Sequence, residues 1–326
     1  MTRRRIVSGL VLAALASVLA YAMLAALTDA RAAAEAIRTF PPAAFAAMLA
    51  LSLVCYVLRA VRWRYYAGLL GYEASWRDAF YVHFSGMTMT VTPGKVGEVL
   101  KAYLGRETVG MPMTRGVTLL FTERLADLIA VLVLATGGLS LLANGWLWLV
   151  LVFGAVVAGT FVLASERFHD FALRFLQKRG WMRDHHASAA AVSETFRTTL
   201  SLRAVAVAIP ISIVAWGAEG VAFYLCLRAL DFDGLGFFAA VAAYAVSTVI
   251  GALAFLPGGV GLTEASLAGL TVAAGAEGSV ATAATILVRI ATLWFGVALG
   301  WVVFAMRPAV LRGFVSRPAE ADDASD

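Results

Sequence analysis

Long apolar stretches separated by shorter polar connections dominate the pattern of this chain. A helix needs about 20 apolar residues to cross the hydrocarbon core of a bilayer. Six stretches are long enough to do so: 6–27, 42–61, 116–142, 146–164, 204–230 and 281–305. The pattern therefore predicts an all-α, polytopic membrane protein with about six full spans.

Four further apolar segments form two pairs, each divided by a Pro-Gly dipeptide. The pairs are 79–92 and 96–104, divided by Pro93-Gly94, and 236–256 and 262–274, divided by Pro257-Gly258. Proline cannot continue a helix, and glycine permits turn conformations that other residues avoid. We therefore predict two re-entrant helical hairpins whose second helices begin around Val96 and Leu262. The alternative is that segment 236–256, which is long enough, spans by itself.

The two Pro-Gly elements belong to an internal repeat. Residues 93–98 read PGKVGE and residues 257–264 read PGGVGLTE, with the two prolines 164 positions apart. An arginine lies in the span after each motif, Arg124 in the first copy and Arg289 in the second. Similar segments that start with Tyr and end in Arg-Ala precede the motifs, at 56–60 and 224–229. The predicted unit is a span, a broken hairpin and a second span, and it occurs twice.

Lysine and arginine concentrate on one predicted side of the membrane. With the N-terminus inside and both hairpins re-entrant, the cytoplasmic parts hold 21 of the 26 basic residues, as the cytoplasmic bias of basic loops requires. These parts are 1–5, 59–78, 93–115, 165–203 and 306–326. The two hairpins then enter from opposite faces, so the repeat is inverted and both termini are cytoplasmic. Inverted repeats with broken helices are typical of transporters; a duplicated packing unit without transport is the alternative.

The expected organisation has five parts. They are an N-terminal anchor span and external loop (1–40), repeat unit 1 (41–142), a span with a cytoplasmic amphipathic helix (143–203), the inverted repeat unit 2 (204–306) and a cytoplasmic tail (307–326). The first apolar stretch exceeds the about 7–15 residues of a signal peptide core, so we expect an uncleaved anchor. Cleavage near Ala30 is the alternative.

Composition narrows the class of protein. Hydrophobic residues make up 61% of the chain and charged residues 14%, against about 45–50% and about 25% in soluble domains. The net charge of +5 does not indicate nucleic acid, because the basic residues flank apolar spans, where they meet anionic lipid. Cys55 and Cys226 lie in apolar stretches, so we expect no disulfide, metal site or cofactor. The phosphate-loop pattern GxxxxGK[ST] is absent from the sequence, which leaves ATP-driven transport unsupported.

The helix that follows each break is a candidate anion site. Its first turn has unpaired N–H groups and a partial positive charge, which attract a phosphate or carboxylate. Lys95 would strengthen this site in the first copy, whereas Gly259 leaves the second copy weaker. Glu98 and Glu264 either cap these amides or contact substrate, and the sequence leaves both roles open.

Charged residues inside the spans are further candidates, because such charges usually face a cavity or a partner. Arg124 and Arg289 lie about 12 Å into their helices. Asp127 follows Arg124 by one turn, and Glu264 or Glu219 is the expected partner of Arg289. These charges either pair and tie the two units together, or the arginines bind an anionic headgroup while a carboxylate takes a proton or pairs with an amine.

Three other assignments concern single residues and segments. Arg59, Arg62 and Arg64 alternate with aromatic residues, a mixture typical of the lipid headgroup layer. His83 lies in the first arm of the first hairpin, where we expect a core histidine with satisfied hydrogen bonds. Segment 165–203 is expected to be an amphipathic helix on the cytoplasmic face.

Four motifs in this order resemble a known family. They are RAVRWR (59–64), TPGKVGEVLKAYL (92–104), ERLADLIA (123–130) and PGGVGLTEASL (257–267). They resemble the flippase-like family named for the transmembrane region of lysylphosphatidylglycerol synthase, over about residues 6–306. Members of that family are linked to moving or handling membrane lipids. The resemblance implies that a central site is shaped by Pro93, Gly94, Gly97, Glu98, Pro257, Gly258, Gly259, Gly261 and Glu264.

The resemblance also limits the expected activity. The full synthase carries a soluble catalytic domain after its membrane part, whereas only 20 residues follow Met306 here, so we expect no synthesis of lysyl-lipid. The expected function is a flippase that moves a polar- or phosphate-headed lipid across the bacterial cytoplasmic membrane, through a groove between the hairpins. The alternative is a membrane enzyme or accessory subunit in lipid-linked glycan, aminoacyl-lipid or hopanoid synthesis. Expected partners are anionic or phosphate-headed lipids, with a homo-oligomer or a lipid-synthesis enzyme as open alternatives.

Overall fold

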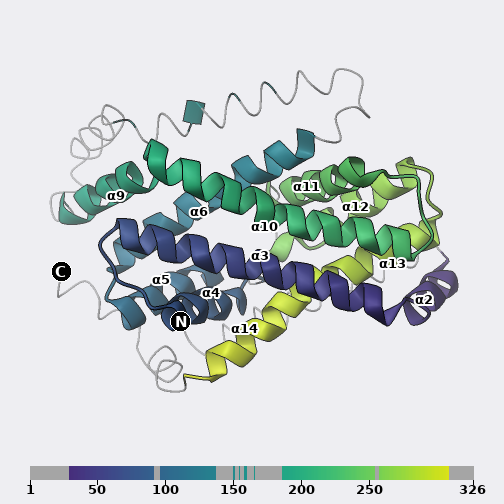
Figure 1. Ribbon diagram of the computed structural model, residues 1–326, viewed down its shortest axis with the longest axis horizontal. Coiled ribbons are helices and arrows are strands. Elements are labelled where there is room, and N and C mark those ends of the chain that lie inside the picture. The colour runs from purple at the N-terminus through teal and green to yellow at the C-terminus, as the bar shows by residue number, and fades with distance from the viewer. Residues whose placement is uncertain are drawn as a thin grey trace.

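A computed structural model describes residues 29–91, 96–136, 186–253 and 257–307, with isolated positions between 150 and 165. These residues form helices and turns, with no strand among them, which confirms the all-α class. The α-helices of the first half of the chain are α2 (Ala30–Arg38), α3 (Pro42–Leu69), α4 (Trp76–Met87), α5 (Val96–Val109) and α6 (Met113–Ala135) (Figure 1). Those of the second are α9 (His186–Thr199), α10 (Leu202–Ala229), α11 (Phe237–Leu253), α12 (Leu262–Ala273), α13 (Gly278–Arg289) and α14 (Phe295–Ala305). A 3₁₀ turn, η3 (Pro257–Gly259), precedes α12, and a π-helical segment, η4 (Ile290–Trp294), joins α13 to α14.

Three helical stretches among the described residues are long and apolar enough to cross a membrane. They are α3, α10 and the continuous stretch Gly278–Ala305, each of 28 residues. At about 1.5 Å per residue each measures about 42 Å, more than the about 30 Å of a hydrocarbon core. They contain the predicted spans 42–61 and 281–305 and all but the last residue of 204–230. The predicted spans 6–27 and 146–164 lie outside the described residues or almost wholly so, and the count of six stays a prediction.

The predicted span 116–142 and the two hairpins differ from these three stretches. Helix α6 runs for 23 residues but carries Glu123, Arg124 and Asp127 in its middle. Helix α11 is described over 17 residues, or about 26 Å, and whether segment 236–256 spans by itself stays open. Helix α12 begins at Leu262, as the sequence predicts, and α5 is described from Val96 onward.

The second break shows why glycine is required there. Gly258, Gly259 and Gly261 have φ angles of +60°, +67° and +94°, which is the left-handed region that residues with a Cβ avoid. The chain therefore turns between α11 and α12 without adding side chains to a crowded place. Residues 92–95, which include the first Pro-Gly pair, lie outside the described residues.

The two units pack on each other through equivalent contacts. Helix α3 packs along α10, α4 packs on α14 of the other unit, and α11 packs on α6 of the other unit. The short helices repeat the pattern, because α2 packs on α13 and α9 packs on α6. The two hairpins lie toward opposite ends of the long helices (Figure 1). The repeat thus extends to α2 and α9, which sequence comparison of the two copies does not reveal.

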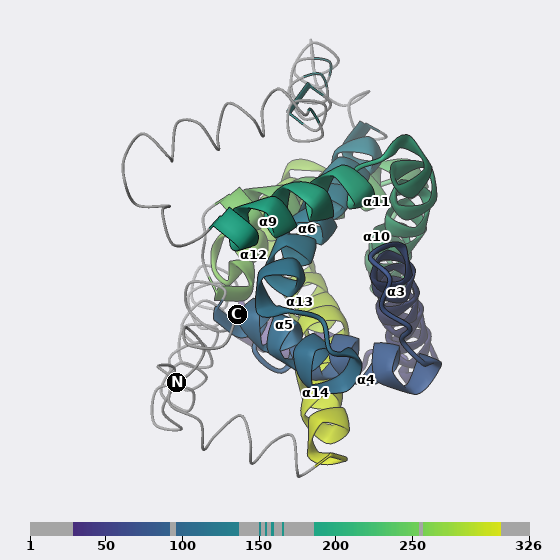
Figure 2. The same cartoon turned by 90° about the vertical axis from the view of Figure 1, so that its left-hand side faces the viewer.

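The alignment of α3 with α10 corrects one part of the predicted repeat. Helix α3 continues to Leu69, so segment 56–60 lies in its middle, whereas segment 224–229 is the end of α10. By position from the helix start, Arg59 and Glu219 correspond, since each is the eighteenth residue of its helix. The two helices lie side by side along one side of the bundle (Figure 2). Equivalent positions of the two helices, counted from each start, therefore carry opposite charges.

Close contacts fix α14 against the first hairpin. A Cβ on Gly300 would lie 2.7 Å from the carbonyl oxygen of Phe84 and 2.8 Å from the amide nitrogen of Thr88, both backbone atoms of α4 and its end. At the far end of α14, Arg307 donates a hydrogen bond of 2.9 Å to Asp78. Burial raises the pKa of Asp78, but hydrogen bonds from Ser75 and Arg307 outweigh it and lower the pKa from the ordinary 3.8. This ion pair joins the start of α4, outside the predicted spans, to the second unit.

Helix α9 is the described part of the predicted segment 165–203. Thr195 and Thr199 are buried, and the Thr199 hydroxyl lies 3.0 Å from that of Thr122 on α6. On the outer side, Glu194 accepts a hydrogen bond of 2.6 Å from Arg115. One face of α9 is therefore packed and the other is exposed, as expected of an amphipathic helix.

Candidate functional site

A central cavity of about 200 Å³ lies between the two units. Its wall includes both hairpins and the middles of α3 and α10, where Tyr56 and Trp216 are each the fifteenth residue of 28. A cavity at this depth is about 20 Å from either end of the long helices. Its polar lining residues are Tyr56, Arg59, His83, Thr90, Lys101, Arg124, Glu219, Tyr244, Thr248, Thr263, Arg289 and Thr292.

Arg289 and Glu264 hold the second break in place. The Nε of Arg289 donates to Oε1 of Glu264, and its Nη2 donates to the carbonyl oxygen of Gly258, both at 2.7 Å. The other carboxylate oxygen of Glu264 accepts the amide of Gly261 at 2.7 Å, so Glu264 also caps α12. This confirms Glu264 as the partner of Arg289 and as a helix cap. Arg289 and Gly259 line the cavity, whereas Glu264 lies behind that lining.

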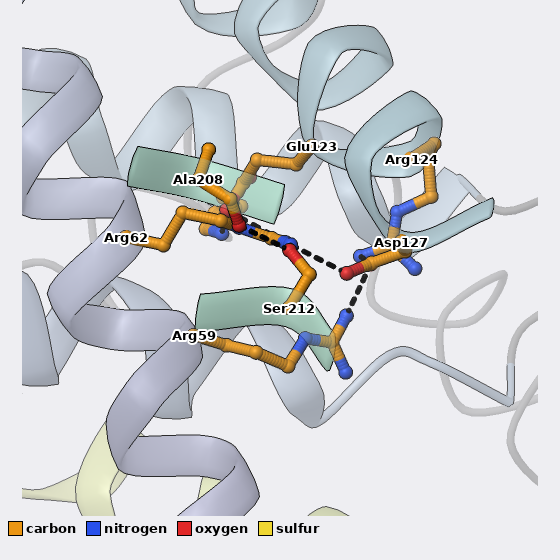
Figure 3. A network of polar contacts seen from close by, with 8 residues as sticks. Arg59, Arg62, Glu123, Arg124, Asp127, Ala208 and Ser212 are labelled. Atoms are coloured by element: carbon orange, nitrogen blue, oxygen red, sulfur yellow. Dashed lines mark hydrogen bonds and ion pairs between the residues drawn. The ribbon is translucent and has the colours of Figure 1, made fainter. Parts of the chain in front are cut away.

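Asp127 is the centre of a buried network in the first unit (Figure 3). One of its oxygens accepts from Arg62 at 2.6 Å, and the other accepts from Arg59 at 3.1 Å. Arg124 lies 3.4 Å from the same carboxylate. Arg62 also donates to Ser212 of α10, so this network connects the two units through a hydroxyl group.

The placement of Arg59 and Arg62 in the headgroup layer is wrong. The Arg62 side chain is 0% exposed and that of Arg59 is 12% exposed, because α3 extends eight residues beyond the predicted end of its span. Both arginines therefore lie within the helix bundle, where Asp127 pairs with both and Glu123 lies 3.8 Å from Arg62. Arg64 instead donates to the carbonyl oxygen of Ala74 and stacks on Trp76, 4.3 Å from the ring centroid. Whether Arg64 meets lipid headgroups stays a prediction.

Lys101 and Glu123 form a second buried pair, which the sequence analysis missed. The ammonium group of Lys101 lies 2.7 Å from both carboxylate oxygens of Glu123. The two residues lie on α5 and α6, 22 positions apart, so no local spacing connects them. Gly86 of α4 allows the approach, because a Cβ there would lie 3.2 Å from the Cβ of Lys101. The one available signal was a lysine within the apolar run of segment 96–104.

The charges around the cavity are arranged unevenly. Arg59, Lys101, Arg124 and Arg289 line it, and Glu219 is the acidic residue that the described lining includes. The carboxylates that pair with these cations, on Asp127, Glu123 and Glu264, are not part of the lining. Glu219 accepts a hydrogen bond of 2.8 Å from the hydroxyl group of Tyr244. A group inside the cavity therefore faces mainly cations. The ion pairs of Arg59 with Asp127, Lys101 with Glu123 and Arg289 with Glu264 each lie within one unit and do not connect the two units.

His83 differs from the satisfied core histidine that the sequence suggests. Its side chain is 4% exposed and lines the cavity. Neither ring nitrogen has a hydrogen-bond partner among the described residues. His83 thus adds an unsatisfied polar group to the cavity wall.

The remaining predicted residues belong to the first break. Pro93, Gly94 and Lys95 lie outside the described residues. Gly97 and Glu98 lie in the first turn of α5, but the structure describes only their backbone. An anion site at this helix start stays a prediction.

Apolar helices of spanning length around a buried, charged cavity define a multi-pass membrane protein. The family model described as "Lysylphosphatidylglycerol synthase TM region" matches residues 6–300, and the chain belongs to this family. A UPF0104 membrane protein of Methanothermobacter thermautotrophicus is 25% identical over 284 residues, which cover 78% of this chain and 81% of the relative. The resemblance noted in the four sequence motifs is thus confirmed.

Proposed function

We propose that this protein is a lipid flippase of the bacterial cytoplasmic membrane, which moves a polar- or phosphate-headed lipid without changing it chemically. The observation that supports this most is the cation-lined cavity in the middle of the bundle, to which both hairpins contribute. Charged groups at membrane depth are costly and are typically kept where they serve a pathway. Membership of a family described by a lipid-synthase membrane region agrees with a lipid substrate.

The size of the cavity indicates which part of the lipid would enter it. About 200 Å³ accommodates a headgroup fragment but not two acyl chains, so the chains would stay in the bilayer while the head passes through. Passage requires the wall to open toward each leaflet in turn. The π-helical segment η4 is a candidate for this movement, because such segments are frequent at functional sites and Thr292 and Leu293 of η4 line the cavity.

The proposed topology follows that of transporters with inverted repeats. The hairpins would enter the membrane from opposite faces, with both termini in the cytoplasm. Their location at opposite ends of the long helices agrees with this arrangement (Figure 1). A second copy of the chain or a lipid-synthesis enzyme is a proposed partner, to be sought by native mass spectrometry of the purified protein.

Reconstitution tests the proposal directly. Vesicles containing the protein and fluorescent lipids with different heads are treated with dithionite, which bleaches the outer leaflet. We expect bleaching beyond the outer half for at least one phosphate-headed lipid. Thr248→Trp, which fills the cavity, should abolish this, whereas Leu270→Trp, on the exposed side of α12, should not. Rates equal to those of empty vesicles across the whole lipid panel would refute a flippase.

The same vesicles separate a carrier from an enzyme. We expect mass spectrometry to recover the lipid unchanged after transport, because the proposal includes no chemical step. A protein-dependent mass change in the lipid, with no acceleration of its movement, would instead support the enzyme alternative.

A further inference from the structure

His83 is the feature of the cavity that the proposed function does not use. It lies on α4, is 4% exposed, and neither ring nitrogen has a hydrogen-bond partner among the described residues. An imidazole carries at least one N–H donor in either of its common protonation states. A buried donor without a partner costs about 1–3 kcal/mol. A ligand that accepts this hydrogen bond would recover that cost.

The neighbours of His83 define the charge of such a ligand. Lys101 packs against Gly86, which lies three residues after His83 on α4. A Cβ on residue 86 would lie 3.2 Å from the Cβ of Lys101. Arg59 lines the same cavity, and its Nε has no hydrogen-bond partner among the described residues. Lys101 is buried and the Arg59 side chain is 12% exposed, and their carboxylate partners are outside the lining. This wall therefore presents positive charge and N–H donors and favours an anion.

The arrangement of donors indicates the shape of the anion. Arg59, His83, Lys101 and Arg124 come from four different helices, α3, α4, α5 and α6, around one volume. Donors that converge from several directions match a tetrahedral oxyanion better than a planar carboxylate. Arg289 of the second unit is less suitable, because its Nε and Nη2 already donate to Glu264 and Gly258, whereas the Nε of Arg59 and both ring nitrogens of His83 have no hydrogen-bond partner among the described residues.

We propose that the wall formed by the first unit is a phosphate subsite, in which His83 donates a hydrogen bond to a phosphate oxygen of the bound headgroup. The substrate class is then a lipid whose head contains a phosphate mono- or diester. This inference rests on the proposed function for the identity of the lipid, but the subsite itself is tested by binding alone. His83 is a specificity-determining residue in this arrangement, because it donates a hydrogen bond to the phosphate that a neutral lipid lacks.

Binding to the purified full chain tests the subsite without any transport step. Isothermal titration would compare dihexanoyl phosphatidic acid, inorganic phosphate, dihexanoylglycerol and hexanoate. We expect the phosphate-bearing lipid to bind at least about tenfold tighter than dihexanoylglycerol, and inorganic phosphate to bind more weakly by the same residues. His83→Phe keeps the ring shape but no donor and should weaken phosphate binding about tenfold. His83→Gln keeps an N–H donor and should retain most of it, and the control His186→Leu, at the start of α9, should change nothing.

A wild-type measurement covers the case in which His83→Phe does not fold. The chain has four histidines, so ¹⁵N-labelled histidine gives a spectrum of few signals. We expect one signal, absent in the His83→Gln variant, to shift with phosphatidic acid and with phosphate but not with dihexanoylglycerol.

The outcomes separate this inference from the proposed function. If phosphate binding depends on His83 but the protein moves no lipid, the result supports the subsite and refutes the flippase. The subsite alone would be refuted if the protein transports lipid but His83→Phe leaves its phosphate binding unchanged. It would also be refuted if the protein transports lipid but binds hexanoate or dihexanoylglycerol as tightly as the phosphate-bearing lipid.

Discussion

The pair formed by Arg289 and Glu264 allows a stringent test of how charge is accommodated in the bundle. Their side chains are 7% and 0% exposed, and their charged atoms lie 2.7 Å apart. Removing one member of such a pair leaves the other charge buried without compensation, which costs about 3–5 kcal/mol. We therefore expect Arg289→Met and Glu264→Gln each to lower the free energy of unfolding by about that amount.

The double variant should be much less destabilised than the sum of the single variants. A glutamine at 264 still offers an oxygen to the amide of Gly261, so the cap of α12 survives. What remains lost is the hydrogen bond from Arg289 to the carbonyl oxygen of Gly258, worth about 1–3 kcal/mol when the carbonyl is left unsatisfied. The expected coupling between the two substitutions is thus about 3 kcal/mol or more, in the favourable direction.

Equilibrium unfolding in mixed detergent micelles, followed by tryptophan fluorescence, measures these free energies. The matched control is Arg115→Met, because the pair of Arg115 with Glu194 has a similar separation of 2.6 Å but is 22% and 52% exposed. That control should cost less than about 1 kcal/mol. Additive losses in the double variant would refute the reasoning that the two buried charges compensate each other.

The double variant also decides between two roles of Arg289. If it folds and still transports lipid, Arg289 positions the break and does not bind the headgroup. If it folds but binds no phosphate-bearing lipid, Arg289 is a substrate ligand, which is one of the two alternatives that the sequence leaves open.

Three further predictions follow from single contacts. Asp78→Asn removes a carboxyl group whose pKa is lowered in the folded state. The contribution of this carboxylate to the free energy of unfolding is therefore present above about pH 4 and is lost as the pH falls below it. The melting temperature of the wild type should exceed that of Asp78→Asn by an amount that shrinks between about pH 5 and pH 3, and a constant difference would contradict this. Gly300→Ala should cost about 1–3 kcal/mol, since its Cβ would meet backbone atoms, whereas Gly269→Ala, with no atom within 4 Å, should change the unfolding free energy by less than about 0.5 kcal/mol. Cysteines replacing the exposed Arg77 and Glu277, in a background without native cysteines, should react with an impermeant maleimide from opposite sides of the membrane, and labelling from one side would contradict the inverted topology.

The parts of the fold that the sequence predicts are those with a local physical cause. Pro257 and the glycines after it end one helix, and Leu262 starts the next, because proline and left-handed glycine act on their own backbone. The pairing of Arg289 with Glu264 was predictable because the repeat unit brings the span beside its own hairpin. The same reasoning did not reach Lys101 and Glu123, whose second-unit counterparts carry no charge.

The misplacement of Arg59 and Arg62 shows where local reasoning fails. Alternating arginine and aromatic residues are typical of a membrane interface, and the pattern alone does not distinguish an interface from a buried network. Asp127 makes the difference, and it lies 65 positions after Arg62. A charge this far along the chain reaches its partner only when α6 packs in the bundle.

By itself, the sequence determined the membrane class, the helical content and the position of the second break, since hydrophobic length, proline and glycine act locally. Only the tertiary structure decided which charges meet. The antiparallel packing of α3 on α10 sets Arg62 against Ser212, and the packing of α4 on α14 and of α11 on α6 encloses a cavity between the units. These relations depend on how helices far apart in the chain are aligned, and burial of charge makes the correct alignment much more stable than the alternatives.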